Sequence, residues 1–136
     1  MAARLTGIVV ALAGLLSVNL LLYAAGRASG GGFSYVQHGR PVRVEAVAIT
    51  LLSLGPLLTG LILVSVLSRW WSGVVMTAKV VAPLLAVATI LVMTIPAGFD
   101  TTSTVYLALM HLATIPAALL AIPRAAVAVP DRLAID

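Results

Sequence analysis

Apolar residues in this chain are gathered into four long runs, separated by short segments that carry charges, glycine or proline. Within each run nearly every position is apolar, a pattern typical of a helix surrounded by hydrocarbon. About 20 residues at about 1.5 Å each cross the hydrocarbon core of a bilayer, which is about 30 Å thick. The pattern therefore predicts an all-α bundle of four transmembrane helices in a single membrane domain. The domain comprises residues 1–136, with helices at about 5–25, 44–67, 79–97 and 102–122 and a short tail at 124–136.

The first run has an alternative interpretation as a secretory signal peptide. Arg4 could serve as the basic start of such a peptide, and the small residues at 24–26 could form its cleavage site. However, residues 5–25 are all uncharged, which makes the apolar part longer than the usual 7 to about 15 residues. We therefore expect the run to be a transmembrane helix.

The last run contains a titratable residue deep in apolar sequence, His111. The run begins behind Asp100, whose side-chain oxygens can accept hydrogen bonds from the free amides of a first helical turn. At helical spacing His111 shares a face with small residues such as Ala108 and Ala118, whereas large leucines gather on the opposite side. Because a polar side chain is costly in hydrocarbon, this face should point into the bundle. We expect neutral His111 to hydrogen-bond to another helix, and the candidate partners are Asn19, Thr50 and Ser53.

The segment between the first two runs, residues 26–42, has the composition of a loop. Three consecutive glycines begin at Gly30, and Gly39 and Pro41 follow; such residues interrupt helices. Apolar and polar residues alternate loosely between them, so the loop is expected to fold back on the membrane interface. The glycines lack the spacing of a phosphate-binding loop, so nucleotide binding is not expected.

Composition supports a membrane location and excludes some chemistry. Hydrophobic residues make up 62% of the chain and charged residues 9%, against about a quarter charged in soluble domains. Mean hydropathy is +1.18. The absence of cysteine excludes disulfides, thiolate metal sites and cysteine nucleophiles. The net charge of +4 arises from basic residues at the ends of apolar runs, so nucleic acid is not an expected partner.

The basic residues also predict which way the helices run. With four spans both termini lie on one side, and the cytoplasmic side usually carries more arginine and lysine. The face that holds the termini has five basic residues and the other face has three. We therefore expect cytoplasmic N- and C-termini in a bacterial plasma membrane. The five residues are Arg4, Arg69, Lys79, Arg124 and Arg132, and the three are Arg27, Arg40 and Arg43.

Polar side chains within the runs fall at similar depths below the outward face. Counted from the outer end of each expected helix, they lie roughly 8 to 15 Å below the surface at about 1.5 Å per residue. This polar layer is the candidate binding site, and charged residues form a rim above it. The layer comprises Asn19, Thr50, Ser53, Thr89 and His111, and the rim comprises Arg43, Glu45 and Asp100.

Three segments near the two ends of the chain carry a resemblance to a known family. Residues 18–23 read VNLLLY, residues 26–28 read GRA, and residues 107–112 read LALMHL. The chain resembles, over nearly its whole length, an uncharacterised family of small four-helix membrane proteins from actinobacteria, defined as a domain of unknown function. The resemblance implies the fold and an inner-membrane location. It implies no activity, so no catalytic role is carried over to Asn19 or His111.

Three classes of function are compatible with the sequence. The first is a non-catalytic accessory or binding protein, because helix capping and the helix dipole explain Glu45 and Asp100 without chemistry. The second is a small oligomeric transporter or channel that uses the His111 layer, since prolines and buried polar groups often line a path. The third is a membrane-embedded enzyme, which would require Glu45, Asp100, Ser53 and His111 to converge.

The favoured interpretation is the non-catalytic protein, with no catalytic residue, cofactor or metal. No His, Asp or Glu residues stand at the spacing of a metal site, and a bis-histidine haem would need a second histidine within the membrane. The expected partners are the lipid bilayer and either another membrane protein or further copies of the chain in a homo-oligomer.

Overall fold

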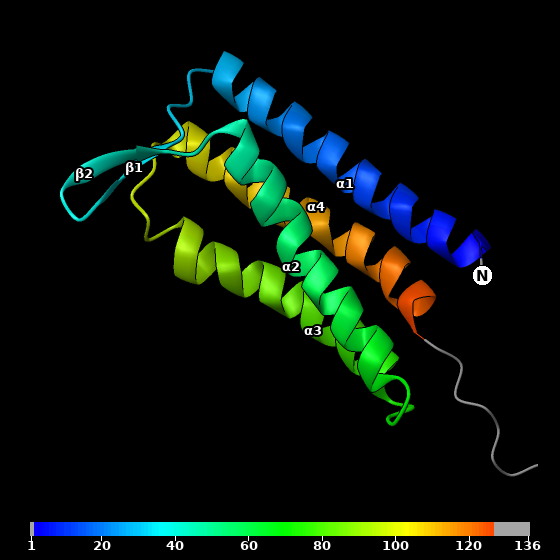
Figure 1. Ribbon diagram of the computed structural model, residues 1–136. Helices are drawn as coiled ribbons and strands as arrows, with labels where there is room; N and C mark the ends of the chain where they lie inside the picture. Colours follow the sequence, from blue (N-terminus) through cyan, green and yellow to red (C-terminus); the bar gives the residue numbers. More distant parts are fainter. Residues whose placement is uncertain (1, 127–136) are drawn as a thin grey trace, which may run out of the picture.

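The computed structural model describes residues 2–126, which form four long helices and one β-hairpin (Figure 1). The expected tail lies outside the described residues beyond Ala126. The third helix continues without interruption into a short π-helical segment, η1. The elements are α1 (Ala2–Ala28), β1 (Ser34–Gln37), β2 (Arg40–Arg43), α2 (Ala46–Leu67), α3 (Val74–Thr89), η1 (Ile90–Thr94) and α4 (Thr101–Ala125).

Each of the four helices is long and apolar enough to cross a membrane. The predicted all-α, four-helix membrane fold is therefore confirmed. Figure 1 shows the helices lying side by side, with the hairpin projecting from the end of the bundle where α1 ends and α4 begins. The protein is a multi-pass membrane protein.

The helix ends differ from those expected wherever a charge was used as a boundary. The third helix begins at Val74, so Lys79 lies within it, and α1 and α4 extend through Arg27 and Arg124. Long basic side chains can reach the membrane surface from inside a helix end, so the charge marks the interface and not the last helical residue.

The core is built mainly where α1 and α4 pack in antiparallel orientation, the most extensive contact between elements. Small buried residues such as Ala11, Ala118 and Ala121 let the two backbones approach closely. Larger residues of α2, Leu57 and Leu61 among them, complete this cluster. The opposite face of α4 is exposed, as the helical spacing predicted: Leu109, Leu112, Pro116, Leu119 and Leu120 all lie outside.

The segment expected as an irregular loop contains a two-stranded antiparallel hairpin. Gln37 pairs with Arg40, which leaves His38 and Gly39 as a two-residue turn. Both have positive φ, 50° and 75°, as a type I′ turn requires. The hairpin was not predicted, because Gly39 was taken only as a helix breaker, although a His-Gly pair between short alternating segments favours a hairpin.

Candidate functional site

Two residues of the predicted polar layer meet in the core. The Asn19 Nδ2 atom donates a hydrogen bond to Ser53 Oγ at 2.7 Å, joining α1 to α2. Asn19 is only 1% exposed, and its Oδ1 atom has no hydrogen-bond partner. Turning the amide over would exchange the two atoms, so either orientation leaves one buried polar atom without a partner. Such an atom carries a desolvation cost.

The other three members of the polar layer do not join this pair. Thr50 donates to Ala46 O at 2.9 Å, and Thr89 donates to Leu85 O at 2.7 Å. Each bond runs to the carbonyl four residues earlier in the same helix, which side chains of this kind reach easily. The polar layer is therefore not a single converging site.

His111 also bonds within its own helix. Its Nδ1 atom lies 2.8 Å from Leu107 O, so Nδ1 carries the proton that it donates to this carbonyl. The side chain is half-buried. The predicted hydrogen bond from His111 to α1 or α2 is wrong, because Nδ1 bonds to a carbonyl one turn away in the same helix.

A network of side-chain and backbone hydrogen bonds lies at the hairpin end, around Asp100. Its carboxylate caps α4 by accepting from the Ser103 amide at 2.9 Å, as predicted. It also accepts from Ser103 Oγ at 2.6 Å and from the Gly32 amide at 3.0 Å. The hydrogen bond from the Ser103 hydroxyl, followed by the one from its amide, lowers the pKa of Asp100. Asp100 therefore caps α4 and also binds the backbone of Gly32, in the segment before the hairpin.

Phe33 is the apolar anchor of the same network. Its ring is fully buried and meets the Tyr23 ring edge-on, with centroids 4.9 Å apart. Its amide donates to Ser103 Oγ at 2.8 Å, and its carbonyl accepts from the Val44 amide at 2.7 Å. Phe33 thus ties the base of the hairpin to both α1 and α4.

Two glycines are required by this close packing. A Cβ atom at Gly26 would lie 2.7 Å from the Phe33 ring and 2.9 Å from Tyr106, and one at Gly31 would lie 2.9 Å from Gly26 O. Arg27 Nη1 closes the loop by donating to Gly31 O and to Gly32 O, at 3.2 and 3.1 Å. We call the residues that hold the hairpin base the hairpin anchor: Gly26, Arg27, Gly31, Gly32, Phe33, Asp100 and Ser103.

Of the hairpin anchor, the sequence predicted Asp100 as the cap of the last helix but not the contacts of most other members. The available signal was the run Gly31-Gly32-Phe33, in which a large aromatic residue directly follows glycines. The remaining rim residues, Arg43 and Glu45, are exposed. Glu45 precedes α2 in extended conformation without a side-chain capping bond, so the rim does not act as one site.

The candidate catalytic side chains are not joined to one another by hydrogen bonds. Ser53, Asp100 and His111 each bond to a different neighbour, as given above, and do not form a hydrogen-bonded chain. Within residues 2–126 no three His, Cys, Asp or Glu side chains are grouped so that they could hold a metal ion. By contrast, the hairpin beyond the anchor is exposed at His38, Arg40 and Val36, the last 70% exposed.

Comparisons of the chain with protein-family models, with curated proteins and with solved structures found no match. The resemblance to the actinobacterial family therefore stays a prediction from three short segments.

Proposed function

We propose that the protein is a non-catalytic binding subunit of the bacterial plasma membrane, with its termini in the cytoplasm and its hairpin outside. In this proposal β1 and β2 form the docking element for an acidic, extended segment of another membrane protein. The observation that carries the proposal is that the hairpin is exposed at its tip yet held firmly at its base.

The hairpin anchor supports the proposal because it fixes a segment that would otherwise be mobile. Isolated two-stranded hairpins are marginally stable in water, and here Phe33, Asp100 and Ser103 supply the missing packing and hydrogen bonds. A segment that is already ordered loses less conformational entropy when it binds a partner.

The chemistry of the hairpin indicates the kind of partner. The described sheet has two strands, so the outer edge of β1 has backbone groups available to a third strand, whereas Pro41 in β2 has no amide to donate. Arg40 and Arg43 on β2 are exposed, and so is Val36 on β1. An acidic partner strand with an apolar residue would complement these features.

The proposed orientation follows from the distribution of basic residues. Arg27, Arg40 and Arg43 belong to the hairpin end, whereas the four members of the larger group that lie within residues 2–126 belong to the opposite end. The positive-inside rule favours the larger group for the cytoplasm. The resemblance described above supports a bacterial membrane.

Photocrosslinking in cells of the native host tests the proposal. A photoreactive amino acid at Val36 should give one protein adduct of defined mass, and the same probe at Trp70, which is exposed at the opposite end, should not. In the variant Arg40→Glu with Arg43→Glu the Val36 adduct should decrease at least fivefold, since like charges would then meet. Unchanged adducts in the charge-reversed variant, or adducts with lipid alone, would overturn the proposal.

One observation favours a transporter as the second candidate. The buried Asn19 Oδ1 atom has no partner, and unsatisfied polar groups within a membrane often belong to a transport path. Proton or ion flux into proteoliposomes that is lost in Asn19→Leu, while the protein stays folded, would favour transport by an oligomer over the binding function. The enzyme alternative has less support, because Ser53, Asp100 and His111 bond to separate neighbours.

A further inference from the structure

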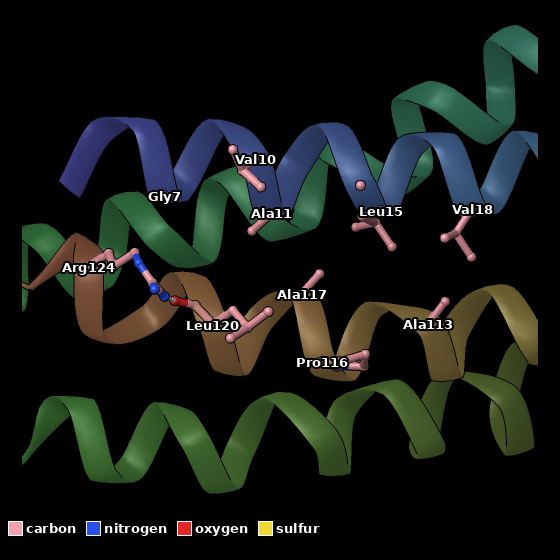
Figure 2. Close-up of a pocket in the computed structure, with 11 residues that line it drawn as sticks. Gly7, Val10, Ala11, Leu15, Val18, Ala113, Pro116, Ala117, Leu120 and Arg124 are labelled. Carbon is pink, nitrogen blue, oxygen red and sulfur yellow. Dashed lines mark hydrogen bonds between the residues drawn. The ribbon is translucent and has the colours of Figure 1, made fainter. Parts of the chain in front are cut away.

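An apolar groove runs along the junction of α1 and α4 (Figure 2). Its volume is about 380 Å³, within the range of ligand pockets. Side chains from both helices line it, including Ala11 and Leu15 of α1 and Ala117 of α4 (Figure 2). Gly14 lies on its wall, and a Cβ atom there would meet no other atom within 4 Å. The groove thus has unfilled space beside Gly14.

We propose that this groove binds an anionic phospholipid, with one acyl chain along the groove and the phosphate at Arg124 and Arg4. The chain is held by apolar contact, and the head group by the two guanidinium groups. This proposal concerns a different face from the hairpin and does not depend on the hairpin's function.

The length of the groove matches one leaflet of a bilayer. It extends along α1 from Gly7 to Val18, which is about 16 Å at about 1.5 Å per residue. Half of a hydrocarbon core about 30 Å thick is about 15 Å. An acyl chain that starts at the membrane surface beside Gly7 would therefore fill the groove and end near the bilayer midplane.

The charge distribution complements an anionic head group. Arg124 lines the Gly7 end of the groove, and its side chain packs against Gly7 and donates to Leu120 O. Arg4 precedes Gly7 by three residues on the same face of α1, and it donates to Ala126 O at 3.3 Å. A guanidinium has five N–H donors in a planar arrangement that suits phosphate. These bonds therefore hold the two side chains in place and leave other N–H donors available.

Acidic groups are distant from this end within the described residues. Glu45 and Asp100 are the acidic residues of the described chain, and both lie at the hairpin end. The groove is apolar along its length and cationic at one end, which complements an anionic phospholipid with apolar acyl chains and a negatively charged head group.

A second copy of the chain fits the groove less well. In a two-fold dimer both copies contribute the same patch. Because both copies would have the same orientation in the membrane, their Arg124 and Arg4 side chains would come together at one depth. Like charges placed together oppose this contact, whereas a phosphate between the arginines relieves it.

Native mass spectrometry of the detergent-purified protein tests the proposal with two probes, phosphatidylglycerol and phosphatidylcholine with the same acyl chains. The wild-type protein should retain one phosphatidylglycerol in preference to phosphatidylcholine. The leucine side chain in Gly14→Leu would fill the groove, so the binding of both lipids should weaken at least tenfold. The matched control Gly60→Leu also enters open space, on α2, and should bind like the wild type.

The head-group contact is tested by a second pair of variants. Arg124→Gln should weaken the binding of phosphatidylglycerol about fivefold. This ratio corresponds to about 1 kcal/mol, the usual contribution of one basic residue near anionic lipid. Phosphatidylcholine binding should not change. Arg69→Gln, an exposed arginine in the loop between α2 and α3, is the control and should bind both lipids as the wild type does.

Three results would overturn the proposal. They are equal retention of both lipids by the wild-type protein, an equal loss in Gly60→Leu and Gly14→Leu, and a wild-type dimer that Gly14→Leu converts to a monomer without change in lipid binding. The last result would assign the groove to a second copy of the chain.

Discussion

At the scale of single residues, the partner of each polar side chain decides its role. His111 and Asn19 both interrupt apolar helices, but His111 bonds to a carbonyl of its own helix and Asn19 bonds across to Ser53. A bond within one helix survives when the helices separate, whereas a bond between helices does not. Asn19 therefore contributes to helix association, and His111 contributes little to it.

Double-mutant cycles should separate the two cases. Asn19→Ala with Ser53→Ala should give a coupling energy of about 0.6 kcal/mol, within the usual upper bound of about 1.7 kcal/mol for hydrogen bonds between membrane helices. Asn19→Ala with His111→Leu should give coupling near zero. The measurement is reversible unfolding in mixed detergent micelles. Coupling of about 1 kcal/mol between Asn19 and His111 would contradict the bonding described here.

The Asp100 carboxylate should make the hairpin anchor sensitive to acid. Hydrogen bonds from Ser103 lower its pKa in the folded protein, so folding favours the ionised form. This stabilisation is present above the unfolded pKa of about 3.9 and is lost as the pH falls through the lower, folded pKa. Hydrogen-exchange protection of the Gly32 and Phe33 amides should therefore decrease below about pH 4.

Asp100→Asn is the matched control, because asparagine also caps helices but does not ionise in this range. Its amide protection should be independent of acid. If protection fell equally in the wild type and in Asp100→Asn, the carboxylate would not be the cause.

At the scale of elements, the hairpin depends on contacts with helices that are distant in sequence. The Ser103 hydroxyl of α4 accepts a hydrogen bond from the Phe33 amide, and Gly26 at the end of α1 leaves room for the Phe33 ring. The helices, by contrast, follow from their own apolar sequence. The hairpin should therefore respond to changes in α1 that leave the helix itself intact.

Gly26→Ala should destabilise the hairpin anchor by about 1 to 3 kcal/mol, the usual range for overpacking. The added methyl group would meet the Phe33 and Tyr106 rings at less than 3.0 Å. Gly14→Ala on the same helix meets nothing within 4 Å and should be neutral or slightly stabilising, because alanine favours helix. The effects of both substitutions are measured by hydrogen-exchange protection of the Phe33 amide and by thermal unfolding. Equal effects of the two substitutions would show that the crowding at Gly26 is not important.

At the scale of the whole molecule, the hairpin lies at one end of the four helices, and the first and last described residues, Ala2 and Ala126, lie at the other (Figure 1). The end of α1 and the starts of α2 and α4 lie at the hairpin end. The start of α1 and the loop after α2 lie at the other end (Figure 1). Which end faces the cytoplasm depends on the positive-inside rule alone.

Cysteine labelling should decide the orientation, and the natural chain has no cysteine to interfere. Gln37 in the hairpin and Ser72 between α2 and α3 are both exposed. An impermeant thiol reagent should label Gln37→Cys in intact cells and Ser72→Cys only after the membrane is permeabilised. The reverse pattern would place the termini outside.

The sequence by itself determined the number of helices, their membrane location, the cap at Asp100 and the exposed face of α4. These features depend on local hydropathy and on spacing along one helix, which are properties of neighbouring residues. Only the tertiary structure decided the hairpin anchor, the partner of His111 and the groove between α1 and α4. Each depends on which atoms of distant segments come close. Asn19 reaches Ser53 because α1 and α2 pack in antiparallel orientation, and Ser103 reaches Phe33 because the chain after α1 folds over the start of α4. His111 lies at helical spacing beside the core, yet its Nδ1 atom bonds to Leu107 O one turn away, and spacing alone could not distinguish that bond from one across the bundle.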